Sequence, residues 1–415
     1  MNNFTKTSTA VADTQSQYDT SRTNFSILIA ICFAHMSNDL IQAIIPSTLP
    51  LLQNNFALNF AQIGLITFCF QVSSSIFQPL VGMYTDKHPT PFSQIIGMML
   101  SASGVVLLSH ANHYYWVLIA VTLIGLGSSI FHPESSRIAF LSSGGRRSLA
   151  QSIFQIGGNT GAALGPLLVA WIVLPHGQKN ILWFVVVAAF AELLLWKIDK
   201  WYSGMLKFVR KHKKSVIKLP DLSHKRVVVT IGILLLLIFS KYIYMASITS
   251  YLQFYMMDQF HIDKVQAQIY LFYFLIAIAL GTLIGGFFGD ILGRKYIIWI
   301  SVLGCAPFTL LLPYANQMWT GVLVAIIGFI LASAFPSILV YAQELLPKKL
   351  GMVSGLFYGF AFGMGGLGAA LLGWWADHSS IEFIYHVCSF LPLIGIVAYF
   401  LPDMKRIHFK EEKVA

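Results

Sequence analysis

Long apolar stretches separated by short polar loops run along almost the whole chain. Twelve of them are apolar enough and, allowing for tilt, long enough to cross a bilayer as helices, which takes about 20 residues each. Residues 1–24 are instead rich in Ser, Thr, Asn and Gln, which predicts a disordered tail. The predicted spans are 25–51, 61–83, 93–110, 115–136, 149–173, 181–198, 227–256, 266–289, 296–313, 318–342, 350–374 and 381–401.

The composition supports an all-α membrane protein. Of the 415 residues, 56% are hydrophobic and 11% are charged, whereas a soluble domain carries roughly 25% charged residues. This excludes most soluble enzymes and nucleic-acid-binding proteins. The four cysteines all lie in apolar runs, without a C-x-x-C pair or zinc-ligand spacing, so no metal site is predicted.

The cationic residues predict the orientation of the chain. Twenty-four of the 27 lysines and arginines lie in the N-terminal tail, in every second loop or in the C-terminal tail, and ten of them fall between residues 197 and 226. Because cytoplasmic loops of membrane proteins collect Lys and Arg, both termini are predicted to be cytoplasmic. The same rule explains the net charge of +10 without a nucleic-acid partner.

Two internal repeats divide the chain at this basic region. The predicted N-terminal half is 25–198 and the predicted C-terminal half is 227–402, joined by a basic cytoplasmic linker at 199–226 and followed by a cytoplasmic tail at 403–415. Two similarly oriented six-helix halves are a transporter architecture, with the substrate path between them near the midplane. The repeated pairs, offset by 203 or 204 residues, are Gly125 and Pro133 with Gly328 and Pro336, and Gly82 and Asp86 with Gly286 and Asp290.

The loop after the eighth span carries the most specific motif. Its residues Gly286, Asp290, Gly293, Arg294 and Lys295 match G-x-x-x-D-x-x-G-R-K, and the chain is thereby similar to the major facilitator superfamily. The resemblance implies a fold of twelve transmembrane helices in two pseudo-symmetric halves. It also implies a secondary transporter that works by alternating access, and gating roles for the charged residues of the motif.

The first copy of the motif keeps Gly82 and Asp86 but lacks the second glycine. An aspartate at the membrane edge can cap the positive N-terminus of a neighbouring helix. The resemblance implies that Asp86 and Asp290 latch the outward-facing state, and that their contacts are released in the inward-facing state. Alternatively, both loops are turns that only fix the topology.

Three further features concern gating. Gly161, Gly165 and Pro166 resemble the G-x-x-x-G-P signature of the superfamily's antiporters, although the glycine pair that follows is missing; tight helix packing is the alternative. Glu134 and Arg137 are spaced for an i, i+3 ion pair. We also expect Arg137 to pair with Asp86 across the cytoplasmic gate.

Several segments of the predicted spans resemble one branch of the superfamily in particular, a branch found in bacterial inner membranes. The resemblance implies export of a small anionic phosphonate antibiotic by proton antiport, with the proton gradient in place of a cofactor. We expect the protein to be a monomer. Its expected partners are the small-molecule substrate, protons and the lipid bilayer. The segments are His35–Asp39, Gly125–Arg137, Ser152–Asn159, Phe239–Ser247 and Gly359–Gly366.

Ionisable side chains inside spans mark candidate sites, because burying them in a bilayer is costly. Asp39 and Lys241 both lie near mid-depth, and the repeat offset of 203 places Lys241 opposite Asn38. We expect Lys241 to anchor the substrate anion and Asp39 to be the proton-sensitive group that competes for it. The alternative is a permanent ion pair that braces the two halves.

Other polar groups in the spans extend these candidates. His35 shares one helical stripe with Asp39, and His132 and Glu134 are candidate proton relays or members of a structural ion cluster. Amides and phenols could hydrogen-bond a phosphonate, or could simply join helices to one another. The further substrate-binding candidates are Asn38, Gln71, Gln155, Asn159, Tyr242 and Tyr244.

Two other classes of function are less compatible with the sequence. No zincin motif, nucleophile elbow or phosphate-binding loop is present, which argues against a membrane enzyme or a nucleotide-driven pump. An uptake symporter or exchanger for an organic phosphate or another small anion would have the same fold. The sequence therefore leaves the direction of transport open.

Overall fold

The computed structural model describes residues 22–212 and 216–413. Twelve helices in these ranges are long and apolar enough to span a membrane, and they confirm the predicted spans to within a few residues at most ends. The predicted disordered tail at 1–24 falls mostly on residues outside the described ranges.

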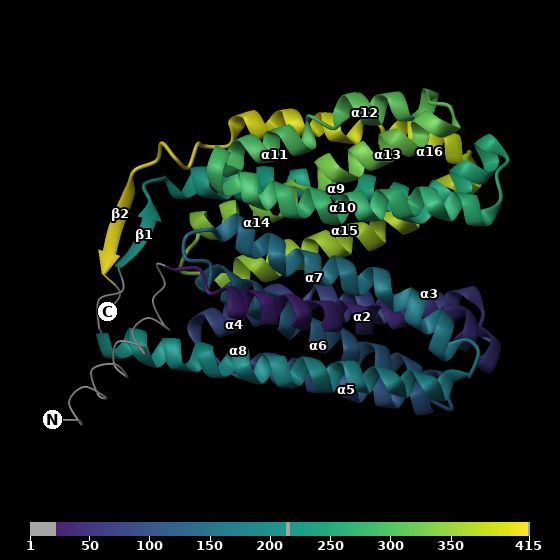
Figure 1. Cartoon of the computed structure of the whole chain (residues 1–415), viewed down its shortest axis with the longest axis horizontal. Helices are drawn as coiled ribbons and strands as arrows, with labels where there is room; N and C mark the ends of the chain where they lie inside the picture. The colour runs from purple at the N-terminus through teal and green to yellow at the C-terminus, as the bar shows by residue number, and fades with distance from the viewer. Residues whose placement is uncertain (1–21, 213–215, 414–415) are drawn as a thin grey trace.

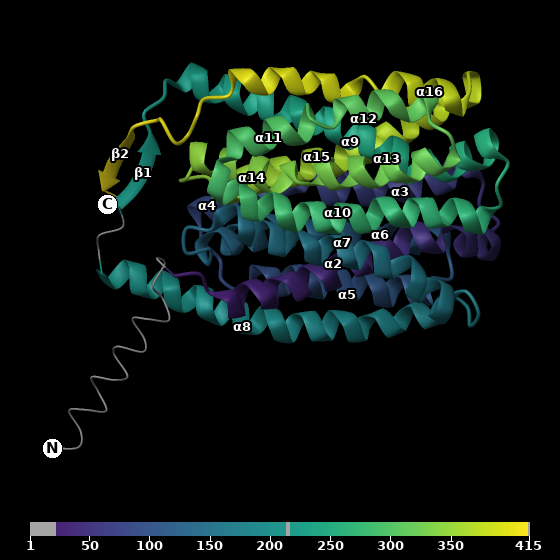
Figure 2. The ribbon, with the colours of Figure 1, turned by 45° about the horizontal axis from the view of Figure 1, so that its top comes forward.

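The first six spans form one bundle and the last six form another (Figures 1 and 2). The N-terminal bundle consists of α2 (Phe25–Phe56), α3 (Phe60–Ser75), α4 (Phe77–Lys87), α5 (Ser93–His110), α6 (Tyr114–Leu141), α7 (Arg147–Leu168), η1 (Val169–Val173), η2 (Gln178–Trp183) and α8 (Phe184–His212). The C-terminal bundle consists of α9 (His224–Phe260), α10 (Lys264–Leu292), α11 (Arg294–Val302), α12 (Ala306–Leu311), η3 (Leu312–Tyr314), α13 (Gln317–Ala332), α14 (Ala334–Leu345), α15 (Leu350–His378), α16 (Ile381–Cys388) and η4 (Leu391–Phe400).

Two breaks in the spans have local causes. Pro166 removes an amide donor from α7, and the following turn, η1, widens into a π-helix. The tenth span is divided into α13 and α14 at Ser333, and Pro336 lies in the first turn of α14, where its missing N–H costs least. Both prolines are therefore tolerated, with only local changes of helix geometry.

One end of the bundle, which we call the basic end, carries residues 22–24, the loop 142–146, residues 199–212 and 216–226, and residues 401–413 (Figure 1). There α8 continues to His212, past the predicted boundary at 198. Strand β1 (Val216–Pro220) pairs antiparallel with β2 (Phe409–Lys413), with Pro220 opposite Phe409, beyond the ends of the helices (Figure 1). The predicted linker and the predicted C-terminal tail thus form one small sheet.

The halves meet closely at the basic end, where α4 packs on α15 and α10 packs on α7. A Cβ added to Gly82 would lie 2.1 Å from the carbonyl oxygen of Gly351, so the two backbones touch and only glycine fits. The structure is therefore closed at this end.

Candidate functional site

Three ionisable side chains meet inside the N-terminal half. His35 and Asp39 come from α2, one helical turn apart, and His132 comes from α6. Asp39 Oδ2 lies 3.2 Å from His35 Nε2, and Asp39 Oδ1 lies 3.4 Å from His132 Nε2. The two Nε2 atoms are 3.2 Å apart, and both histidines are fully buried. We call these three residues the His–Asp–His cluster.

The geometry of this cluster can hold an additional proton. His35 Nδ1 lies 2.7 Å from the carbonyl oxygen of Phe154, and His132 Nδ1 lies 3.1 Å from that of Ser128. A carbonyl oxygen only accepts, and the Ser128 hydroxyl, 3.2 Å from His132 Nδ1, donates to Gln42 Oε1. In that arrangement each Nδ1 donates and a neutral imidazole has a bare Nε2. Two bare nitrogens and a carboxylate would repel one another at these distances, and one proton shared between them would remove that repulsion.

Polar neighbours complete the coordination of Asp39. The side-chain amides of Asn38 and Gln42 each donate to Asp39 Oδ1 at 2.9 Å, and Ser128 Oγ donates to Gln42 Oε1 at 3.0 Å. Asn38, a candidate substrate ligand by sequence, is thus buried beside Asp39. Gly158 of α7 makes room for the cluster, because a Cβ there would lie 2.6 Å from Asp39 Oδ2.

Lys241 of α9 is buried in the C-terminal half without an acidic partner. Its Nζ lies 5.6 Å from the ring centre of Tyr242 and 5.4 Å from that of Phe335, within the range of cation–π attraction. Within the described ranges, no carboxylate lies within ion-pair distance of Lys241. The predicted competition of the substrate with Asp39 for Lys241 therefore has no basis in this conformation.

A small cavity of about 20 Å³ lies beside Lys241. Gln155, Asn159 and Tyr242, three of the predicted substrate ligands, line it together with the lysine. Its volume suffices for about one water molecule. A phosphonate can enter only after the surrounding helices have moved.

Two predicted ligands lie elsewhere. Tyr244 is buried within the core of the C-terminal half, and its hydroxyl has no hydrogen-bond partner within the described part of the chain. Gln71 of α3 lies against Gly366 of α15, because a Cβ on that glycine would be 2.4 Å from the amide nitrogen of Gln71. Neither residue lines the cavity beside Lys241.

An aromatic bridge connects the cluster to the lysine. Tyr358 of α15 places its ring 5.3 Å from that of His132 and 5.1 Å from that of Phe335, which in turn faces Lys241. The Tyr358 hydroxyl donates to Gln155 Oε1 at 3.1 Å, across the two halves. The sequence analysis missed Tyr358 and Phe335, because nothing distinguishes them among 32 Phe and 17 Tyr.

The first gate motif acts as a helix cap. Asp86 accepts hydrogen bonds from the backbone N–H groups of Gly351 and Met352, at 2.9 and 2.8 Å, at the start of α15. Arg137 donates to Asp86 at 2.6 Å and to Glu134 at 2.8 Å. The expected pairing of Arg137 with Asp86 is confirmed. Glu134, a proton-relay candidate by sequence, belongs to this group and not to the His–Asp–His cluster.

The second gate motif caps α7 in the same way. Asp290 accepts from the N–H groups of Ser148 and Leu149, both at 3.0 Å, and Arg294 donates to Asp290 at 3.3 Å. Glu344 of α14 binds Arg294 at 3.0 Å.

Glu344 also reaches across to the N-terminal half, where it binds Arg147 at 2.7 Å. The sequence analysis did not single out Glu344, because this residue lies just beyond the predicted end of the tenth span and only ionisable side chains inside spans mark candidate sites. Lys295, the last residue of the second gate motif, donates instead to the carbonyl oxygen of Tyr399 at 2.8 Å, within the C-terminal half.

The antiporter-like residues of α7 pack within one half. A Cβ on Gly161 would lie 2.0 Å from the carbonyl oxygen of Met36, and one on Gly165 would lie 2.5 Å from Ala43 Cβ. These glycines, with Pro166 just beyond them, bring α7 onto α2. They position the helix that faces the cluster, and they make no contact of this kind between the halves.

Metal binding was not expected, yet the cluster has the right atoms for it. Two imidazole nitrogens and a carboxylate oxygen, all within 4.8 Å of one another, could surround a divalent cation. A single proton satisfies the same three atoms and leaves the buried cluster uncharged overall. The cluster is therefore a candidate proton site, and metal chelation is included as a control below.

Comparisons with known proteins agree with this fold. The Major Facilitator Superfamily model matches residues 31–255 and 233–414. The chain is 58% identical to the fosmidomycin resistance protein of Escherichia coli over 382 residues, 92% of this chain and 94% of that protein. It is 41% identical to an uncharacterized MFS-type transporter of Bacillus subtilis over 387 residues, 93% and 95% of the two chains.

Solved structures share the fold at low sequence identity. The fucose:proton symporter of E. coli superimposes with a TM-score of 0.70 at 16% identity, over 92% of this chain and 98% of that one. The human organic anion transporter gives a TM-score of 0.70 at 16% identity, over 92% and 100%. Together with the family match, they confirm the predicted family and fold: the chain belongs to the major facilitator superfamily, whose members are membrane transporters of small molecules and not enzymes.

Proposed function

We propose that this protein exports a fosmidomycin-like phosphonate from the bacterial cytoplasm in exchange for protons, by alternating access between its two halves. The observation that carries the proposal is the His–Asp–His cluster, whose geometry suits a bound proton. The 58% identity to the fosmidomycin resistance protein supports the class of substrate. The sequence-based orientation supports placing the basic end in the cytoplasm.

Lys241 is the proposed anchor for the substrate anion. A buried ammonium without a carboxylate partner is costly, and a phosphonate would offset that cost with charge-assisted hydrogen bonds. Gln155, Asn159 and Tyr242 line the same cavity and offer further hydrogen-bonding groups. We expect them to contact the substrate once the cavity enlarges.

Coupling in this proposal is steric. A proton in the cluster would attract an anion near Lys241, so electrostatics alone favours symport. The compact, protonated cluster, however, holds Tyr358 against His132 and Gln155, and with them a cavity too small for the substrate. Loss of the proton leaves three mutually repelling acceptors, which separate and let the cavity open. Proton and substrate then exclude each other, as antiport requires.

The two aspartate caps supply the gate at the basic end. Asp86 fastens α4 to α15, and Asp290 fastens α10 to α7, so both must release before substrate enters from the cytoplasm. Each cap joins a carboxylate to a helix N-terminus, a contact that water can replace. The gate can therefore open without unfolding a helix.

Inverted membrane vesicles test the direction of transport. With an acidic lumen, they should accumulate fosmidomycin, and collapse of the proton gradient should release it. Accumulation that instead requires an alkaline lumen would identify a proton symporter that imports its anion. Parallel vesicles with EDTA should behave identically; loss of transport under chelation would replace the proton in the cluster by a metal ion.

A further inference from the structure

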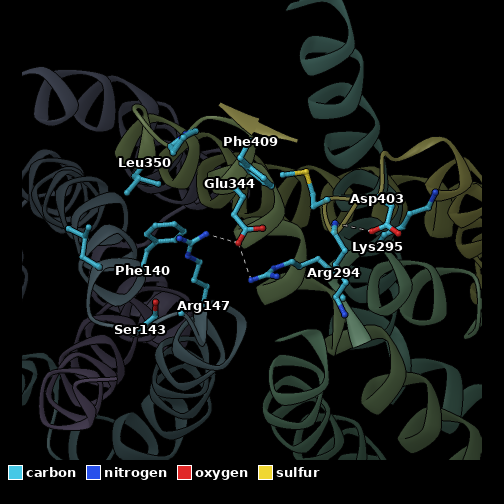
Figure 3. A pocket seen from close by; sticks show the side chains of 15 residues that line it. Phe140, Ser143, Arg147, Arg294, Lys295, Glu344, Leu350, Asp403 and Phe409 are labelled. Atoms are coloured by element: carbon cyan, nitrogen blue, oxygen red, sulfur yellow. Dashed lines mark hydrogen bonds and ion pairs between the residues drawn. The ribbon is translucent and has the colours of Figure 1, made fainter. Parts of the chain in front are cut away.

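A second, much larger cavity, of about 660 Å³, lies at the basic end where the halves meet (Figure 3). This volume is typical of sites for small molecules. Arg147 and Phe140 line it from the N-terminal half, and Arg294, Glu344 and Leu350 line it from the C-terminal half. Phe409, at the start of β2, lies on its border.

The charges around this cavity favour an anion. Four cationic side chains line it, against two carboxylates. Lys295 and Lys405 donate to the carbonyl oxygens of Tyr399 and Ile291, each at 2.8 Å, and these neutral acceptors leave the lysine charges in place. Helix α11 also begins here without a capping side chain, which adds the positive end of its dipole.

Glu344 is an incomplete partner for the two arginines. Both Arg147 and Arg294 bind the same atom, Glu344 Oε1, as the dashed lines in Figure 3 show. The Nε of Arg294 is buried and has no hydrogen-bond partner among the residues that the structure describes. A phosphonate or phosphate group offers three acceptor oxygens, which suit the planar fork of a guanidinium better than one carboxylate oxygen does.

We propose that this cavity is a loading site for a small phosphonate or phosphate anion, which displaces Glu344 from Arg147 and Arg294. The displacement would replace the direct Arg147–Glu344 ion pair between the halves by contacts to a mobile anion, and departure of that anion toward the central cavity would leave the halves without this link and favour opening of the gate. The inference rests on the proposed function in taking the basic end as the side from which substrate enters.

Binding of methylphosphonate to the full-length protein tests the site. Isothermal titration calorimetry would use phosphatidylcholine nanodiscs and a Lys241→Met background, which removes the proposed central anchor. We expect Arg147→Gln to weaken binding about tenfold and Glu344→Gln to tighten it about tenfold, the order of one charge-assisted hydrogen bond lost or one competitor removed. The opposite signs are decisive, because both substitutions break the same ion pair.

Asp403→Asn is the matched control, since this carboxylate lines the cavity but pairs with Arg406, at 3.4 Å. It should change the affinity less than about twofold, because a partly exposed carboxylate that already pairs with Arg406 contributes little. Changes of the same sign for Arg147→Gln and Glu344→Gln, or an equal gain for Asp403→Asn, would show that the ion pair is only a latch and overturn the proposal.

A lipid headgroup carries the same chemistry as a free phosphonate. Equal affinity in nanodiscs with and without phosphatidylglycerol supports the loading site, whereas loss of methylphosphonate binding in the anionic nanodiscs assigns the cavity to lipid and overturns it. If methylphosphonate binds as expected but vesicles show no proton-driven fosmidomycin transport, the proposed function fails and this site stands. The reverse result rejects this site alone.

Discussion

Asp39 of α2 and Lys241 of α9 occupy almost equivalent positions in the two repeats, but their surroundings differ. Asp39 has two imidazoles and two amides within contact distance, whereas Lys241 faces two aromatic rings and a cavity. Burial of a charge is tolerated when it is paired. In the proposed function, a proton would complete the first site and an anion from outside would complete the second. The comparison therefore supports the proposal that the two ligands bind in different halves.

Asp39→Asn should produce the largest effect on this comparison. An asparagine amide can donate to a bare imidazole nitrogen, so the cluster no longer needs its extra proton. We expect proton-driven accumulation in vesicles to fall about a hundredfold, the upper end of coupling between two sites. Counterflow of substrate without a gradient should persist. Equal loss of counterflow in well-expressed protein would remove Asp39 from the coupling role.

Lys241→Met removes the charge but keeps most of the side-chain volume. Substrate affinity should fall about thirtyfold, the value of a charge-assisted hydrogen bond of ~2 kcal/mol. Unlike Asp39→Asn, it should weaken counterflow and driven transport alike. Lys241→Arg should recover part of the affinity. Normal counterflow by Lys241→Met would mean that the anion binds elsewhere.

Gly158→Ala tests how tightly the cluster is packed. The added Cβ would lie 2.5 Å from His35 Cε1 and 2.6 Å from Asp39 Oδ2. We expect a loss of about 1.5 kcal/mol in unfolding free energy, typical of overpacking, measured by thermal unfolding in detergent. Gly232→Ala of α9 is the control, since no atom lies within 4 Å of its added Cβ. Equal stability of the two variants would contradict the packing seen here.

Tyr358→Phe should give the smallest effect, because it keeps the aromatic bridge and removes only the hydrogen bond to Gln155. A bond of ~1 kcal/mol predicts about a fivefold loss of driven transport and a shifted pH profile, with counterflow unchanged. Tyr251→Phe loses a similar bond, to the carbonyl oxygen of Ala369 within the C-terminal half. If both variants behave alike, Tyr358 does not couple the halves.

The sequence was sufficient for the features that depend on local pattern. Apolar runs predicted twelve spans, and the repeated Gly and Asp of the gate motifs predicted two similar halves. The capping role expected for Asp86 and Asp290 corresponds to hydrogen bonds at the starts of α15 and α7. These features succeeded because a helix end or an apolar run is defined by neighbouring residues.

The partners of Asp39 could not be predicted in the same way. Sequence placed Asp39 and Lys241 at similar depth, but the rotation of each helix decides which side chains meet. In the structure α6 turns His132 toward α2, and Tyr358 and Phe335 lie between the cluster and Lys241. Contacts between helices that are far apart in the sequence depend on how the helices pack, and a single sequence does not show this packing directly.

The contact of Gly82 with Gly351 has a consequence for the speed of the cycle. At this contact two glycine backbones meet, so no side chain has to leave a pocket when the helices separate. Steric clashes therefore add little to the energy barrier for opening. The contact between the halves is then held mainly by the surrounding ion pairs and helix-capping hydrogen bonds, which ions and water can replace. Opening at the basic end should accordingly be fast, and more responsive to ionic strength than to membrane thickness.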